Sequence, residues 1–71
     1  MSDMEAVRTA RALYVKWVGY PTDGRIDYDR MRNSMLQELR YDLTKPERRG
    51  VVREIRREMI LLGKVRKVLG V

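Results

Sequence analysis

The amino-acid sequence contains no cysteine and no histidine among its 71 residues. Without cysteine there are no disulfides, no thiolate metal ligands and no thiol nucleophile. Without histidine there is no imidazole to bind zinc, to serve in a catalytic triad or to transfer protons near neutral pH. The carboxylates form no pair suited to acid–base catalysis, and no glycine-rich phosphate loop or nucleophile motif occurs. We therefore expect a protein that is not an enzyme and that has no metal or cofactor.

Long apolar runs are also missing. No run exceeds four residues, as at residues 59–62, whereas a membrane span needs about 20. Near the start of the chain stand Asp3 and Glu5, and no apolar stretch of the secretory type follows them. We therefore expect a soluble cytoplasmic protein with no membrane span. Its length allows one small domain.

The apolar residues recur at helical spacing in three segments. The first helix is predicted over residues 3–18, because Ser2 and Glu5 form a capping box and Gly19 and Pro21 end the pattern. Residues 19–27 are predicted to form a loop with a turn at Asp23. The apolar stripe of the first helix is expected to comprise Ala6, Val7, Ala10, Leu13, Tyr14, Trp17 and Val18.

A second helix is predicted over residues 28–43 and a third over residues 46–62. Asp27 would cap the second, and Thr44 with Glu47 would form a second capping box before the third. Gly50 costs about 1 kcal/mol against alanine inside a helix, so a close helix contact is expected there. The second stripe is Tyr28, Met31, Met35, Leu36, Leu39 and Leu43, and the third is Val51, Val52, Ile55, Met59 and Leu62.

Residues 63–71 are ambiguous. A straight continuation of the third helix would place Arg66 on the core side, so we expect a break near Gly63, followed by one more helical turn or a frayed end. No strand-like alternation occurs. The sequence therefore predicts an all-α fold, a small antiparallel three-helix bundle with a short fourth C-terminal turn as an option.

Residues 23–27 are similar to the middle of an EF-hand calcium loop. The similarity covers only about five residues, and Gly19, Pro21 and Arg30 occupy positions where oxygen ligands are required. We therefore expect a turn and a helix cap here, and no metal site.

The net charge of +6 lies entirely in the last third of the chain. Residues 1–43 hold seven basic and seven acidic residues, whereas residues 44–71 hold nine basic and three acidic residues. On a helical wheel most of these basic side chains fall opposite Ile55. Glu54 and Glu58 lie among them, and Glu54 is placed to pair with Arg57. The spacing predicts a basic strip that attracts polyanions, although an ordinary solvated helix face would look the same.

Arginine outnumbers lysine twelve to four. The guanidinium group can bind phosphate through two parallel hydrogen bonds, which an ammonium group cannot do. We therefore expect a DNA- or RNA-binding protein that contacts the phosphate backbone. The residues expected to bind nucleic acid are Arg49, Arg53, Arg56 and Arg57, with Lys45, Arg48, Lys64 and Lys67 at the margins.

Several apolar residues are expected to point away from the core of the bundle. A second copy of the chain would cover them, which predicts a homodimer. The main alternative function is a small regulator or inhibitor, for example of a mobile element, that grips an acidic protein surface. A third is a short membrane-surface segment at the C-terminal end. The partner or dimer interface would comprise Tyr41, Ile60, Leu61, Val65 and Val68.

Overall fold

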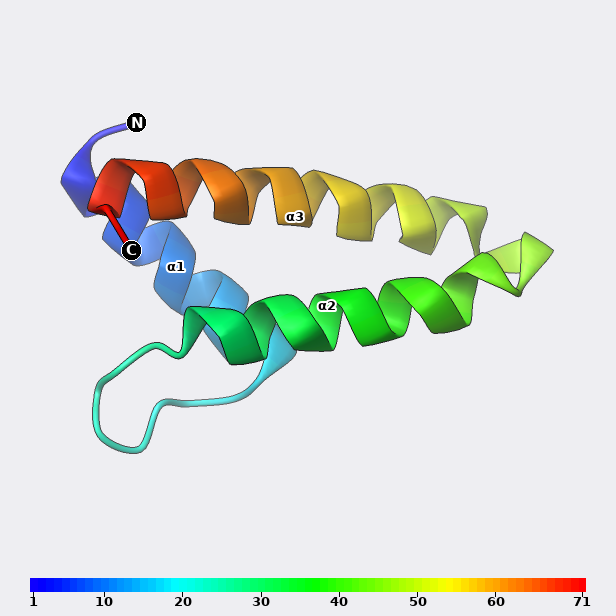
Figure 1. The fold of residues 1–71 in the computed structure, drawn as a ribbon, viewed down its shortest axis with the longest axis horizontal. Coiled ribbons are helices and arrows are strands. Elements are labelled where there is room, and N and C mark those ends of the chain that lie inside the picture. Colours follow the sequence, from blue (N-terminus) through cyan, green and yellow to red (C-terminus); the bar gives the residue numbers. More distant parts are fainter.

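The computed structural model describes residues 1–71 and contains three α-helices and no strand. They are α1 (Asp3–Trp17), α2 (Tyr28–Leu43) and α3 (Arg49–Leu69), with a 3₁₀ turn, η1 (Pro46–Arg48), directly before α3. In Figure 1, α2 and α3 lie antiparallel and are joined by a tight corner, while α1 crosses them at the end that holds both chain termini. Each helix packs against the other two. The predicted all-α three-helix fold is confirmed.

Side-chain caps begin the first two helices where the sequence predicts them. The backbone N–H of Glu5 donates to Oγ of Ser2 over 3.2 Å, and the Ser2 hydroxyl donates to the Glu5 carboxylate over 3.2 Å. At α2, the backbone N–H of Arg30 donates to Oδ1 of Asp27 over 3.0 Å. These bonds satisfy backbone donors that have no partner inside the helix. The first helix ends at Trp17, one residue earlier than predicted.

The corner between α2 and α3 differs from the prediction. Thr44 and Glu47 form no capping box. Instead, the Thr44 hydroxyl donates to the carbonyl oxygen of Tyr41 over 2.8 Å, so it satisfies a backbone acceptor in the last turn of α2. Lys45 stands before η1 and contributes no side-chain cap. The two helices are linked by an ion pair in which Nε of Arg48 lies 3.2 Å from Oδ1 of Asp42.

The core forms two adjacent clusters. The larger cluster joins all three helices, and the smaller one lies where two alanines of α1 let α3 approach closely. Val7 and Leu43, which the apolar spacing predicts in the core, are exposed. Val7 lies at the margin of the apolar stripe of α1, and Leu43 is the last residue of α2. The clusters comprise Leu13, Tyr14, Met31, Met35, Ile55 and Leu62, and Ala6, Ala10 and Val65.

The prediction of a break near Gly63 is wrong, because α3 continues to Leu69. Arg66 is accommodated without reaching the core. Its guanidinium lies 5.7 Å from the ring centroid of Tyr28, and it donates to Oδ1 of Asp29 over 3.2 Å. The expected close contact at Gly50 is also absent, since a Cβ added there would meet nothing within 4 Å. None of the helices has the length and apolar character needed to cross a membrane.

Candidate functional site

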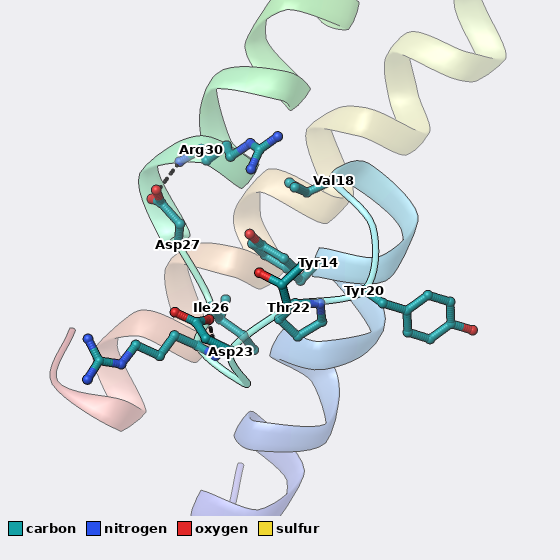
Figure 2. Close-up of a pocket in the computed structure, with 10 residues that line it drawn as sticks. Tyr14, Val18, Tyr20, Thr22, Asp23, Ile26, Asp27 and Arg30 are labelled. Atoms are coloured by element: carbon teal, nitrogen blue, oxygen red, sulfur yellow. Dashed lines mark hydrogen bonds between the residues drawn. The ribbon is translucent and has the colours of Figure 1, made fainter.

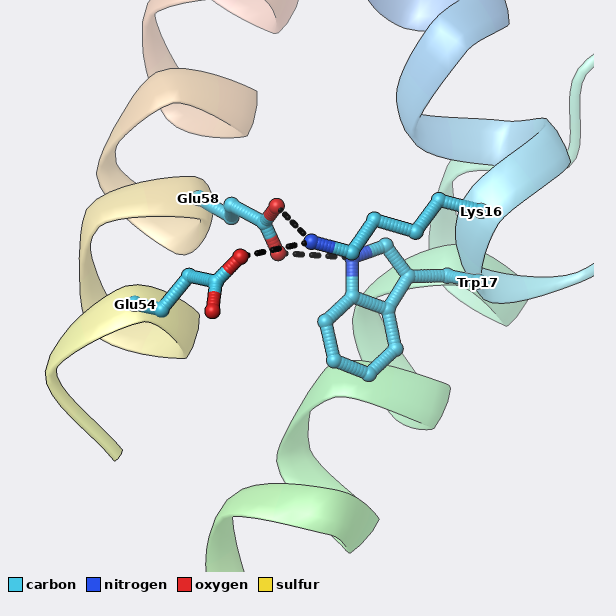
Figure 3. Close-up of polar contacts among 4 residues, drawn as sticks. All are labelled: Lys16, Trp17, Glu54 and Glu58. Carbon is cyan, nitrogen blue, oxygen red and sulfur yellow. Dashed lines mark hydrogen bonds and ion pairs between the residues drawn. The ribbon is translucent and has the colours of Figure 1, made fainter. Parts of the chain in front are cut away.

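The two acids on α3 face α1 and bind Lys16. Nζ of Lys16 lies 3.0 Å from Oε1 of Glu54 and also contacts Glu58 (Figure 3). The indole N–H of Trp17 donates to the second oxygen of Glu58 over 3.0 Å. The hydrogen bond with Glu58, followed by that with Glu54, raises the pKa of Lys16 above its ordinary value of 10.5. The expected pairing of Glu54 with Arg57 therefore does not occur.

Seven of the eight basic side chains predicted to bind nucleic acid have no acidic partner. None of the seven lies within 4.0 Å of a carboxylate, and all seven are exposed. Arg48 differs, because it is paired with Asp42. The unpaired residues are Lys45, Arg49, Arg53, Arg56, Arg57, Lys64 and Lys67.

Five of these seven residues line one cleft beside the corner between α2 and α3. The cleft has a volume of about 540 Å³, and we call it the basic cleft. Helical spacing explains the grouping, because Arg49, Arg53 and Arg56 recur at intervals of four and three and share one face. Lys64 and Lys67 lie farther along α3 and do not line the cleft. The lining residues are Asp42, Leu43, Lys45, Pro46, Arg49, Val52, Arg53, Arg56, Arg57 and Ile60.

Asp42 is the one acid that lines the basic cleft, and the sequence interpretation overlooked it. It is 1% exposed; its Oδ1 binds Arg48, and its Oδ2 has no hydrogen-bond partner. Arg48 balances its charge, so five positive charges remain around the cleft. A signal was present, because position 42 follows Leu39 by three residues and lies on the apolar stripe of α2. A carboxylate at a core position requires a cationic partner.

The apolar residues predicted to form an interface do not form one patch. Val65 is 0% exposed because it packs against the alanines of α1, and Leu61 is half-buried against the larger core cluster. Ile60 is 62% exposed and lines the basic cleft. Tyr41 is also exposed, but it lies in a separate hollow beside Trp17. With Val65 and Leu61 covered, the apolar arc that suggested a homodimer or a membrane-surface segment is reduced to isolated exposed residues such as Val68.

A third hollow, of about 610 Å³, lies beneath the loop between α1 and α2 (Figure 2). Its acids serve local structure: Oδ1 of Asp23 accepts the backbone N–H of Arg25 over 3.0 Å, and Asp27 caps α2. The predicted turn and helix cap are therefore confirmed. No three acidic residues gather into a group that could hold a metal ion. None of the basic residues predicted to bind nucleic acid lines this hollow.

Comparison of the chain with models of protein families, with curated proteins and with solved structures gives no match. The function is therefore inferred from the geometry of the basic cleft and the exposed side of α3.

Proposed function

We propose that the protein binds nucleic acid without catalysis, and that it contacts phosphates through the exposed basic side of α3. One observation carries the proposal: seven basic side chains on and beside this helix have no acidic partner, while Lys16 binds both acids of the same helix. A positive surface beside a low-dielectric bundle attracts polyanions and accelerates their encounter.

The five cations of the basic cleft are the primary contacts in this proposal. Four of them are arginines, whose planar groups can bind two oxygens of one phosphate. Lys64 and Lys67 extend the positive surface along α3, so a bound strand would run from the cleft toward the C-terminal end of the helix. Contacts with phosphate carry no sequence information, so binding that is largely independent of base sequence is expected.

The test is the affinity for duplex DNA and for structured RNA, measured by fluorescence anisotropy over a range of salt concentrations. Five neutralised phosphates correspond to a slope of about −4.5 for log affinity against log salt on duplex DNA. Arg53→Gln is expected to reduce the magnitude of this slope by about 0.9.

Arg32→Gln is the matched control, because Arg32 is exposed on α2, pairs with no acid and lies outside the cleft. It changes the net charge equally and is expected to leave the slope nearly unchanged. The proposal fails if neither nucleic acid binds at low salt, or if Arg32→Gln weakens binding as much as Arg53→Gln.

The exposure of Ile60 within the basic cleft favours one rival function, recognition of an acidic protein surface. An apolar anchor surrounded by charged residues is typical of a protein interface. If this rival holds, Ile60→Ala lowers the affinity for one stoichiometric protein partner more than any single arginine substitution does. If the protein instead binds phosphates, the arginine substitutions lower the affinity more than Ile60→Ala does.

A further inference from the structure

We propose that the basic cleft binds a phosphate monoester at the end of a nucleic-acid strand in preference to the phosphodiesters within it. The inference rests on the proposed nucleic-acid binding and assigns a particular ligand group to the cleft. It starts from the way the five cations are gathered: Lys45, Arg49, Arg53, Arg56 and Arg57 surround one hollow of about 540 Å³.

The density of positive charge in the cleft exceeds what one internal phosphate can neutralise. A phosphodiester carries one negative charge, whereas a phosphate monoester carries about −1.5 to −2 near neutral pH and has three strong acceptor oxygens. Arg49 and Arg56 lie two helical turns apart, so their Cα atoms are separated by about 10 Å along the axis. Their long side chains can therefore converge on one group from two directions. A monoester is the phosphate group that best satisfies several guanidinium groups at once.

The shape of the cleft supports the same choice. A phosphate inside a duplex presents its free oxygens to one side of the backbone, so a flat basic strip would suit it. A terminal phosphate projects beyond the last sugar and can enter a hollow. Val52, Ile60 and Pro46 also line the cleft, and they offer an apolar surface to the sugar or base of the terminal nucleotide.

The nearby acidic side chains do not pair with the five cations of the cleft. Asp42 is the one carboxylate at the cleft, and the guanidinium of Arg48 binds it at 3.2 Å. Glu54 and Glu58 are bound to Lys16 on the α1 side. The cleft therefore keeps its five positive charges for a ligand.

The experiment measures the affinity of the full chain for single strands of one sequence, by anisotropy of a label placed at the opposite end. The strands carry a 5′-phosphate, a 3′-phosphate or neither. A fourth strand without a terminal phosphate is lengthened until its total charge equals that of the phosphorylated strands. We expect binding to at least one phosphorylated strand to be about tenfold tighter than to the charge-matched strand, which corresponds to about 1.4 kcal/mol.

Two variants locate the effect. Arg56 lines the cleft and pairs with no acid, so Arg56→Gln is expected to abolish the preference for a phosphorylated end while the helical content stays unchanged. Lys67 lies on α3 outside the cleft, so Lys67→Gln is expected to weaken binding to all strands equally and to keep the preference.

The results separate the two proposals. If the phosphorylated and charge-matched strands bind equally, the end-binding inference is wrong, but nucleic-acid binding stands. If no strand binds but duplex DNA or structured RNA does, the end-binding inference is wrong and nucleic-acid binding stands; if none of them binds, both are wrong. Tighter binding of a phosphoserine peptide than of any strand would overturn the assignment to a nucleic acid end. The preferred strand, 5′- or 3′-phosphorylated, identifies the end that the cleft accepts.

Discussion

Arg48 and Asp42 form an ion pair, 3.2 Å between Nε and Oδ1, that joins η1, directly before α3, to the end of α2. The two partners are unequally buried: the Asp42 side chain is fully covered, whereas the Arg48 side chain is 46% exposed. Asp42 also lines the basic cleft, whereas Arg48 does not, so the pair links the acid of the proposed site to the segment that precedes α3.

The unequal burial predicts unequal effects of removing each partner. Arg48→Ala leaves a buried carboxylate without a cation and is expected to lower the free energy of unfolding by about 2 kcal/mol or more. Asp42→Asn removes the buried charge, keeps an acceptor for Arg48 and is expected to cost less than about 1 kcal/mol. Urea denaturation of both variants measures the difference.

Arg49→Ala serves as the control for this comparison, because Arg49 is exposed and has no acidic partner. Its effect on the free energy of unfolding is expected to stay within about 0.5 kcal/mol. A larger loss for Asp42→Asn than for Arg48→Ala would contradict the structural role assigned to the pair.

Gly63 lies inside α3 with no steric reason for a glycine. A Cβ added there would meet nothing within 4 Å, and the backbone is helical. Gly63→Ala is therefore expected to raise the free energy of unfolding by about 1 kcal/mol, because glycine disfavours the helix interior. Gly70→Ala is the opposite case, since Gly70 has φ +69° in the left-handed region and ends α3. Thermal unfolding is expected to show a higher midpoint for the first variant and a lower one for the second.

The sequence predicts most of this fold because helix boundaries depend on local chemistry. The caps at Ser2 and Asp27 and the apolar spacing locate α1 and α2 to within one residue. α3 ends at Gly70, whose left-handed backbone is a local signal, but its continuation past Gly63 depends on tertiary contacts. Asp29 and the ring of Tyr28 lie on another helix, and their contacts with Arg66 allow the helix to continue past Gly63. Spacing within one segment could not reveal that partner.

The sequence predicts which residues belong to the candidate site but not which of them lie together. The charge pattern identifies the basic residues, yet only the packing of α1 on α3 shows that Lys16 binds Glu54 and Glu58. The packing likewise separates Tyr41 from Ile60 and buries Val65. A helical wheel describes one helix, so it cannot show which residues of a neighbouring helix each side meets. That information decides which charges remain unpaired.

Lys16 gives the stability of the bundle a dependence on alkaline pH. Its pKa is raised above 10.5 in the folded protein, chiefly by the hydrogen bond with Glu58 and then by that with Glu54. A cationic group whose pKa is higher in the folded state stabilises the fold fully below its unfolded pKa. That contribution is lost as the pH rises through the folded value. We therefore expect the free energy of unfolding to fall as the pH is raised through and above 10.5.

The test compares the native chain with Lys16→Met, so that the difference between the two proteins reports on this one side chain. The variant keeps the apolar part of the side chain but has no ammonium group to lose. Because the Lys16 side chain is 46% exposed, the pair with Glu54 and Glu58 is expected to contribute about 1 kcal/mol at most. Urea denaturation should show the two proteins differing by that amount near neutral pH and converging above the pKa of Lys16. A constant difference across the whole pH range would mean that the ammonium group does not link α1 to α3 in solution.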